Sequence, residues 1–160
     1  MKKTTLLLIL LVCTLLTSCN ERTTKSYNDT IVDAHTKLFQ ANDAFLKNSL
    51  NYLGKPESKK ELLKLISTTR NQLVEAKKPV ELLAPLNKDH GLRKTMLDMF
   101  NSSITSMDGL ELNIDLLTAK NNEEKAATML QGAFSEILEL DELIKELQVE
   151  YAHENNAQLR

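Results

Sequence analysis

The 160-residue sequence lacks tryptophan and has few aromatic residues, four glycines, three prolines and two cysteines. Sugar-binding surfaces usually need aromatic platforms and β-sandwiches need frequent turns, so both classes are disfavoured. Basic and acidic residues nearly balance, at 20 and 22, and neither sign forms a long block. A nucleic-acid-binding domain would present a basic face. The composition therefore argues against nucleic-acid binding, carbohydrate binding and an all-β fold.

The N-terminal segment has the pattern of a secretion signal. Lys2 and Lys3 form a short cationic region, and an uncharged, mostly apolar run follows over residues 4–16. A membrane-spanning helix needs about 20 apolar residues, so this run is too short to cross a bilayer. We therefore expect residues 1–18 to be a signal peptide that is removed from the mature protein.

The end of this segment, Leu16-Thr17-Ser18-Cys19, resembles the lipobox of bacterial lipoproteins. The resemblance implies cleavage between Ser18 and Cys19 and transfer of a diacylglycerol to the cysteine thiol, usually followed by acylation of the new amine. Several acyl chains anchor a protein durably, whereas one chain binds only marginally. The alternative is an ordinary signal peptide in which a cysteine falls at this place by chance. We expect an exported protein that is held on a membrane by the lipid on Cys19.

The cysteine count agrees with this prediction. Cys13 lies inside the signal, and the lipid would occupy the sulfur of Cys19. The mature chain then has no disulfide, so its roughly 140 residues must be held together by a hydrophobic core. Removal of Lys2 and Lys3 leaves 18 basic and 22 acidic residues, a net charge of −4. One slightly acidic domain without disulfides is expected.

Four stretches of the mature chain place apolar residues at alternating spacings of three and four, which is the spacing of one helix face. They span residues 27–52, 58–78, 92–118 and 121–153. No alternating strand pattern or Asn-Gly hairpin turn competes with them. Helices joined by short connections pack antiparallel, with their apolar faces on one axis. The sequence therefore predicts an all-α fold, an antiparallel up-down-up-down four-helix bundle over residues 27–154.

Local signals place the helix ends. Gly54, followed closely by proline, predicts a left-handed stop after the first helix. Ser58 with Glu61, and Asn121 with Glu124, have the spacing of a capping box, in which two side chains satisfy free backbone donors reciprocally. These pairs predict the starts of the second and fourth helices.

The remaining segments are polar or irregular. Residues 19–26 have no apolar period and predict a short tether that lifts the bundle off the membrane. Pro79 to Gly91 predicts a long, partly ordered link between the second and third helices, with an exposed apolar patch. That patch would include Val80, Leu82, Leu83 and Leu86. Residues 155–160 are polar, and we expect them to fray.

Beyond the lipobox, the chain resembles small surface or periplasmic lipoproteins of Gram-negative bacteria that carry one helical bundle. This resemblance rests on Leu16 to Cys19, on the helix start from Tyr27 to Val32 and on the proline-bearing link. It implies an envelope location and supplies no catalytic residues. Asn20 follows the cysteine where, in enteric bacteria, an aspartate would imply retention in the inner membrane. The outer membrane is therefore the expected location, with the leaflet left open.

Patterns for catalysis or a cofactor are missing. Di-iron bundles use two Glu-x-x-His pairs, and this chain has one, Glu150 with His153. In the expected bundle His35 lies about 12 Å along the axis from His153, too far for one metal ion to bridge. The sequence has no Cys-x-x-Cys-His, Gly-x-Ser-x-Gly or glycine-rich phosphate loop. We therefore expect no enzyme, no cofactor and no metal.

Two glycines lie inside predicted helices, where each costs about 1 kcal/mol relative to alanine. Gly109 and Gly132 should fall at the same height on antiparallel neighbours. One interpretation is close packing of the two backbones. The other is a notch beside Met107, Ser103 and Ala133 that admits an apolar ligand such as an acyl chain.

Hydroxyl groups gather at the middle of the expected bundle. Ser103 lies on the core stripe, Ser106 beside it and Thr69 opposite on the second helix. Buried hydroxyls can bond the carbonyls of their own helix three or four residues back, which is the plainer interpretation. A small polar pocket is the alternative.

Two functions follow from these patterns. The first is a lipid-anchored accessory or assembly protein of the cell envelope that presents a helical surface, with the link patch as contact, to another envelope protein. The alternative is a carrier of a small apolar ligand or metal within the bundle.

Overall fold

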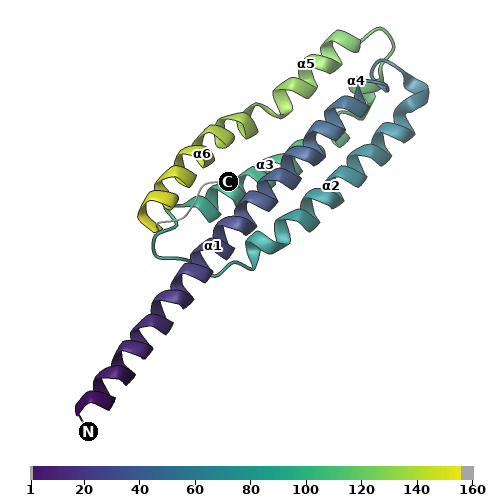
Figure 1. Cartoon of the computed structure of the whole chain (residues 1–160). Coiled ribbons are helices and arrows are strands. Elements are labelled where there is room, and N and C mark those ends of the chain that lie inside the picture. The colour runs from purple at the N-terminus through teal and green to yellow at the C-terminus, as the bar shows by residue number, and fades with distance from the viewer. Residues whose placement is uncertain (1, 156–160) are drawn as a thin grey trace.

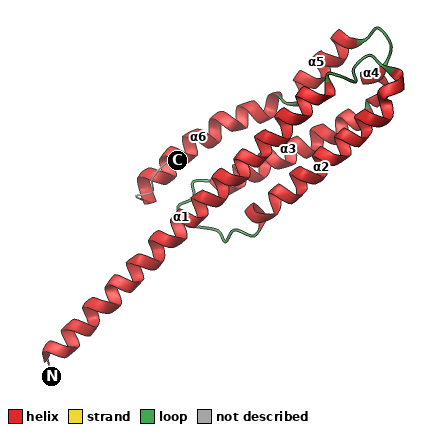
Figure 2. Ribbon diagram, turned by 45° about the vertical axis from the view of Figure 1, so that its right-hand side comes forward, coloured by secondary structure: helices red, strands yellow, loops and turns green. Residues whose placement is uncertain are grey.

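The computed structural model describes residues 2–155, with side chains from residue 24 onward, and all its regular elements are helices (Figure 1). In chain order they are α1 (Lys2–Ser49), the short 3₁₀ helix η1 (Pro56–Ser58), α2 (Lys59–Glu81), α3 (Leu92–Leu112), α4 (Ile114–Thr118), α5 (Glu123–Ala133) and α6 (Ser135–Asn155). Figure 2 shows these helices joined by loops, with no strand in the described part of the chain. The predicted all-α class is confirmed.

The helices pack as neighbours along much of their length. α1 lies along α2, α2 along α3 and α3 along α6, and α1 also approaches α3. α1 contacts α6 and the junction between α5 and α6 through aromatic side chains. The rings of Tyr27 and Tyr151 stack at 5.8 Å between centroids, and those of Phe45 and Phe134 lie 6.0 Å apart. Aromatic pairs of this kind fill a wider gap than aliphatic side chains could.

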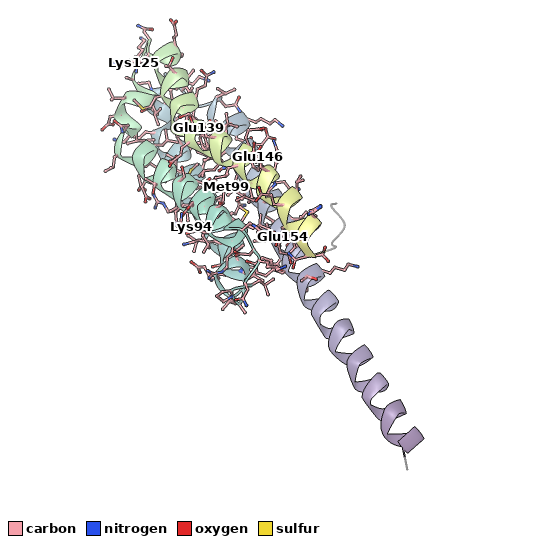
Figure 3. The ribbon with its side chains drawn as sticks, turned by 90° about the vertical axis from the view of Figure 1, so that its left-hand side faces the viewer. Lys94, Met99, Lys125, Glu139, Glu146 and Glu154 are labelled. Carbon is pink, nitrogen blue, oxygen red and sulfur yellow. The ribbon has the colours of Figure 1, made fainter. Side chains whose placement is uncertain are left out.

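The core contains the residues whose spacing predicts the helix faces. Figure 3 shows one of them, Met99, among the helices, and Glu139 and Glu146 on the face of α6 turned to the viewer. Burial of these apolar side chains is the main source of stability in a chain without disulfides. The largest fully buried side chains are Tyr151, Phe45, Phe100, Ile31, Leu38, Leu62, Ile66, Leu73, Leu92, Met96, Met99 and Met107.

The third and fourth predicted helices are each interrupted once, which the sequence pattern misses. Asn113 ends α3, because its side-chain amide donates to the Gly109 carbonyl at 2.8 Å and its own backbone has left the helical region. Phe134 separates α5 from α6, and the following Ser135 hydroxyl donates to the Gly132 carbonyl at 3.0 Å. Side chains that bond nearby carbonyls compete with the helical ladder.

Neither predicted capping box forms. α2 is preceded by η1 instead, and the Lys59 amide bonds the Pro56 carbonyl, so the Ser58 side chain makes no cap. At the start of α5 the residue at the cap is Asn122, whose side-chain amide donates to the Leu116 carbonyl at 2.7 Å. The predicted cap, Asn121, lies one residue earlier, in the turn between α4 and α5, with φ of 60°. Gly54 does have the predicted left-handed conformation, with φ of 69°.

α2 extends past Lys78, where the sequence predicts its end. Pro79 lies within the last turn, and the helix continues to Glu81 because Val80 is fully buried. The missing amide of a proline costs one hydrogen bond, which burial of the next side chain offsets here. The irregular link is therefore residues 82–91, shorter than the predicted Pro79 to Gly91. Its predicted apolar patch is reduced, because Leu83 and Leu86 pack against the core.

The predicted tether also differs from the structure, in which all of residues 19–26 belong to α1. Thr24 to Ser26 belong to α1, and Thr24 is buried with its carbonyl bonded by the Tyr151 hydroxyl at 2.8 Å. Tertiary contacts with α6 thus order residues that lack an apolar period of their own. The side chains of the predicted signal peptide and of Cys19 lie outside the described residues. So does the predicted frayed tail, except Asn155, which ends α6. Within the described part, no helix has both the length and the hydropathy to cross a membrane.

Candidate functional site

One face of α1 carries polar residues at a spacing of seven, which the sequence analysis did not single out. These residues are Asn28, His35, Asn42 and Ser49. Asn28, Asn42 and Ser49 are buried, and His35 is half-buried. A seven-residue period keeps one side of a helix against the same neighbours. The polar row therefore faces the interior, where Asn42 meets α3 and His35 meets α6, while the Ser49 hydroxyl donates to the Leu46 carbonyl of its own helix.

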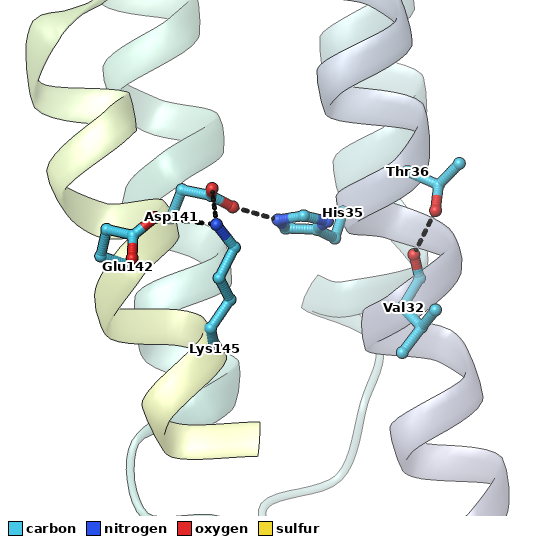
Figure 4. A network of polar contacts seen from close by, with 6 residues as sticks. All are labelled: Val32, His35, Thr36, Asp141, Glu142 and Lys145. Atoms are coloured by element: carbon cyan, nitrogen blue, oxygen red, sulfur yellow. Dashed lines mark hydrogen bonds and ion pairs between the residues drawn. The ribbon is translucent and has the colours of Figure 1, made fainter. Parts of the chain in front are cut away.

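His35 finds its partner on α6 (Figure 4). Its Nε2 donates to Asp141 Oδ1 at 2.6 Å, and the other carboxylate oxygen, Oδ2, accepts from Lys145 Nζ at 2.7 Å. Lys145 also donates to Glu142 Oε1 at 2.8 Å. The His35 ring packs on Phe39, with the ring centroids 4.7 Å apart. This network joins α1 and α6 halfway along their contact.

The charges of this network are mutually supporting. Burial alone would raise the pKa of Asp141, but the hydrogen bonds from Lys145 and His35 outweigh it and hold that pKa below its ordinary value. The same contacts with Asp141 and Glu142 raise the pKa of Lys145. Asp141 is thus an ionised, nearly buried carboxylate whose two oxygens are both engaged.

Stability should therefore fall in acid as Asp141 is protonated. Because its folded-state pKa is lowered, its contribution is present above the ordinary value of 3.8 and is lost as pH falls through the lowered value. Asp141→Asn should cost about 2 kcal/mol at neutral pH, the range for a hydrogen bond to a charged group. Urea unfolding of both proteins at neutral pH and at about pH 3 measures the difference.

Glu142→Gln is the control for this prediction, since it removes an exposed carboxylate one residue away that also binds Lys145. It should leave the acid sensitivity almost unchanged, because exposed ion pairs contribute little. An Asp141→Asn variant that loses as much stability in acid as the parent protein would contradict the role of this carboxylate.

The outer face of α6 is acidic and partly apolar. Seven of its 21 residues are acidic and one is lysine. Leu138 and Val149 are 61% and 56% exposed, three helical turns apart on one stripe with Glu142 and Glu146 between them. Glu139, which Figure 3 labels together with Glu146, is also exposed on α6. Within the described part of the chain, no ion pair involves Glu139 or Glu146.

The structure does not bring the predicted notch residues together. Gly109 lines a shallow groove of about 350 Å³ with Ser106, Met129 and Ala133. Met107 and Ser103 are fully buried in the core, and Gly132 is exposed outside the groove. The close-packing interpretation is wrong, because a Cβ added at Gly109 or at Gly132 would meet no atom within 4 Å.

The predicted polar layer has a different partner from the expected helix carbonyls. Ser103 accepts a hydrogen bond from the Asn42 side-chain amide at 3.0 Å, across the contact between α1 and α3. Ser106 donates to the carbonyl of Ala133 on α5, and Thr69 is buried on α2. Asn42 Oδ1 is buried and has no hydrogen-bond partner among the described residues. The seven-residue polar period of α1 was the signal in the sequence that could have identified Asn42.

The histidines do not form a metal site in the described residues. His153 is exposed, and its predicted mate Glu150 instead lies 3.7 Å from His90 Nδ1. His90 Nε2 is 3.3 Å from Glu154. Among the residues that the structure describes, no group of three or more His, Cys, Asp or Glu side chains could hold a metal ion.

A second polar cluster lies where α1 enters the bundle, an end that we call the base. The Tyr27 hydroxyl donates to Asp89 Oδ2 at 2.8 Å, and the Asn155 side chain donates to the Lys88 carbonyl at 3.2 Å. Burial, with Asp89 nearby, raises the pKa of Tyr151 to about 12 and raises that of Tyr27 further. Both phenols thus stay protonated and serve as donors. The base is held by hydrogen bonds from α1 and α6 to the link.

Comparison of the chain with protein-family models, with curated proteins and with solved structures gives no match.

Proposed function

We propose that this protein is a lipid-anchored module of the cell envelope that binds another protein through the outer face of α6 and catalyses no reaction. The observation that carries the proposal is the combination of exposed Leu138 and Val149 with two exposed carboxylates, Glu139 and Glu146, that make no ion pair within the described part of the chain. Exposed apolar side chains among like charges favour a basic surface as the partner, since complementary charge speeds and orients association.

The proposed arrangement is the up-down-up-down four-helix bundle that the sequence predicts. In it, α3 with α4 and α5 with α6 each count as one interrupted helix. The packing of α1 on α2, α2 on α3 and α3 on α6 supports this topology. The outer face of α6 would then point away from the core, available to a partner.

The proposed location is the outer membrane, with residues 1–18 removed and lipid on Cys19. The support is the lipobox spacing of Leu16 to Cys19 and the Asn20 that follows it. Replacement of Cys19 by serine should move the protein from the membrane fraction to the soluble fraction, without change in its helix content. Cys19→Ser protein that remains in the membrane fraction after a high-salt wash would contradict a lipid anchor.

The alternative, a carrier of a small apolar ligand or metal, has less support. The residues of the predicted ligand notch are divided between the core and the surface, as described above. The larger groove between α1 and α2, about 710 Å³, is floored by Ala41, Ala44 and Ala76, and polar side chains such as Gln40 and Gln72 surround it. It is an open groove rather than an enclosed cavity of the kind that binds most small molecules.

A photo-crosslinking amino acid at Val149 tests the proposed contact in intact cells. The matched control is Val74 on α2, which is 40% exposed against 56% for Val149. We expect a defined crosslinked protein from position 149 and none of that mass from position 74. Equal products from both positions, or none from position 149, would overturn the proposal.

Variants that replace glutamate by glutamine test whether the carboxylates of α6 attract the partner protein. The double variant Glu139→Gln with Glu146→Gln should lose most of the crosslinked product, because it removes the two exposed carboxylates of α6 that make no ion pair among the described residues. The matched double variant Glu61→Gln with Glu124→Gln removes the same charge from exposed positions on α2 and α5. It should keep the product. A parallel loss in both variants would mean that net charge alone governs binding.

A further inference from the structure

The link between α2 and α3 lies at the base of the bundle, beside the point where α1 enters it (Figure 1). Two contacts fix the link there. Tyr27 on α1 donates to Asp89, and Asn155 on α6 donates to the Lys88 carbonyl. The link therefore shares one end of the molecule with the N-terminal part of α1.

The link has a defined conformation rather than a loose one. Arg93 of α3 donates to the last carbonyls of α2, from Nε to Val80 at 3.1 Å and from Nη2 to Glu81 at 2.9 Å. His90 and Gly91 follow with positive φ, of 50° and 85°. Asp89 Oδ1 accepts from the Gly91 amide at 3.0 Å. These bonds hold the residues of the link at the base.

Leu82 projects from this fixed link into solvent. It is 85% exposed, whereas Leu83 and Leu86 pack against the core. Ala84, Pro85 and Lys88 are exposed near it in the chain. An apolar side chain next to small residues and a lysine suits the boundary between lipid headgroups and acyl chains, where lysine ammonium groups also favour anionic lipid.

The distance from the proposed lipid to the base is short. Thr24, which is already buried in the bundle, lies five positions after Cys19 in the chain. As helix these five steps span about 8 Å. Fully extended they would span at most about 18 Å. The base is therefore within reach of the membrane surface that the lipid enters. The predicted tether, in contrast, was expected to lift the bundle off the membrane.

The carboxylates at the base already have partners. Glu150 and Glu154 lie beside His90, Glu154 also lies 3.7 Å from Lys88 Nζ, and Asp89 accepts from Tyr27. Paired carboxylates repel an anionic headgroup less than free ones would. The exposed lysine of the first helical turn in the bundle, Lys25, adds a positive charge on the same end.

We propose that the base of the bundle sits on the membrane surface, with Leu82 of the link in the headgroup region. This inference rests on the proposed lipid anchor at Cys19. The occupant of this surface is a lipid bilayer, and the acidic face of α6 is thereby left clear of the membrane for a protein partner.

The chain has no tryptophan, so a single introduced tryptophan reports its own surroundings. Leu82→Trp is the reporter. Leu112→Trp is the matched control, because Leu112 is 87% exposed near the end of α3, about 30 Å along the axis from the base. Both variants would be purified with their lipid and placed in vesicles of phosphatidylethanolamine and phosphatidylglycerol.

With brominated lipid in the vesicles, the emission of Trp at position 82 should be quenched and blue-shifted relative to position 112. Trp at position 112 should be quenched by soluble acrylamide instead. Ala84→Trp, at another exposed position of the link, gives an independent measurement if Leu82→Trp fails to fold.

Vesicle flotation separates the failure of this inference from failure of the anchor. If the protein floats but bromolipid quenches positions 82 and 112 equally, the lipid anchor is supported and the proposed contact of the base with the membrane is wrong. Protein that is expressed with its native N-terminal segment and does not float would overturn both the lipid anchor and the proposed contact of the base with the membrane.

Discussion

Replacing Gly54 by alanine should lower the free energy of unfolding by about 2 kcal/mol, the cost of holding a residue with a Cβ in the left-handed region. Gly54 has φ of 69°, and its amide bonds the Leu117 carbonyl at 3.0 Å. An added Cβ would also overlap the side chain of Glu123. The turn after α1 is therefore tied to α4 and α5 by a residue that alanine cannot replace.

Gly109→Ala is the matched control, with the opposite expected sign. This glycine is helical, and an added Cβ meets no atom within 4 Å. Alanine should raise the free energy of unfolding by up to about 1 kcal/mol through helix propensity. Urea unfolding measures both variants. Equal changes of one sign would contradict the conformational explanation.

The double variant Gly54→Ala with Glu123→Ala divides the expected cost into two parts. Removal of the Glu123 side chain relieves the overlap, so the stability that is still lost reports the left-handed backbone alone. A double variant as stable as Glu123→Ala by itself would show that the overlap, and not φ, makes Gly54 necessary.

Truncation of Tyr151 to alanine should destabilise the protein by about 4 kcal/mol, as for other large aromatic side chains in cores. Tyr151 is fully buried, stacks on Tyr27 and bonds the Thr24 carbonyl. Tyr151→Phe keeps the ring and loses only the hydroxyl contact, so it should cost about 1 kcal/mol. Urea unfolding of the two variants separates packing from hydrogen bonding.

Hydrogen exchange then locates the damage. In Tyr151→Phe the amides near the start of the bundle should exchange faster, while those in the α2–α3 contact should keep their protection. Loss of protection throughout the molecule in Tyr151→Phe would mean that one hydroxyl supports the whole fold rather than the base.

The sequence predicts the buried helix faces well, because burial requires apolar residues at spacings of three and four whatever the overall composition. Ile31, Ile66, Met99 and Ile144 all lie where the period of three and four places them. The interruption at Asn113 escapes this pattern, because it depends on one side-chain amide reaching the carbonyl of Gly109. Such a local competition leaves the apolar period on both sides almost intact.

The candidate site was harder to predict, because its residues act across helices. His35 lies among polar residues in the sequence, and its partner Asp141 is 106 residues away. Spacing within a helix does not determine which opposing side chain a polar group meets. The seven-residue polar row on α1 was visible in the sequence, although its partners were not. The acidic content of α6 was visible as well, but its exposure depends on how that helix is rotated in the bundle.

The dependence of the α1–α6 contact on distant residues has a consequence for the order of assembly. Its hydrogen bonds close loops of 106 and 127 residues, whereas α1, α2 and α3 meet their neighbours through short connections. Loops of that length carry a larger entropic cost and slow the contacts that close them. We expect the first three helices to associate while the C-terminal part of an emerging chain is still unfolded. α6 then docks last, and until it does, His35 on α1 lacks its partner Asp141 and is open to water.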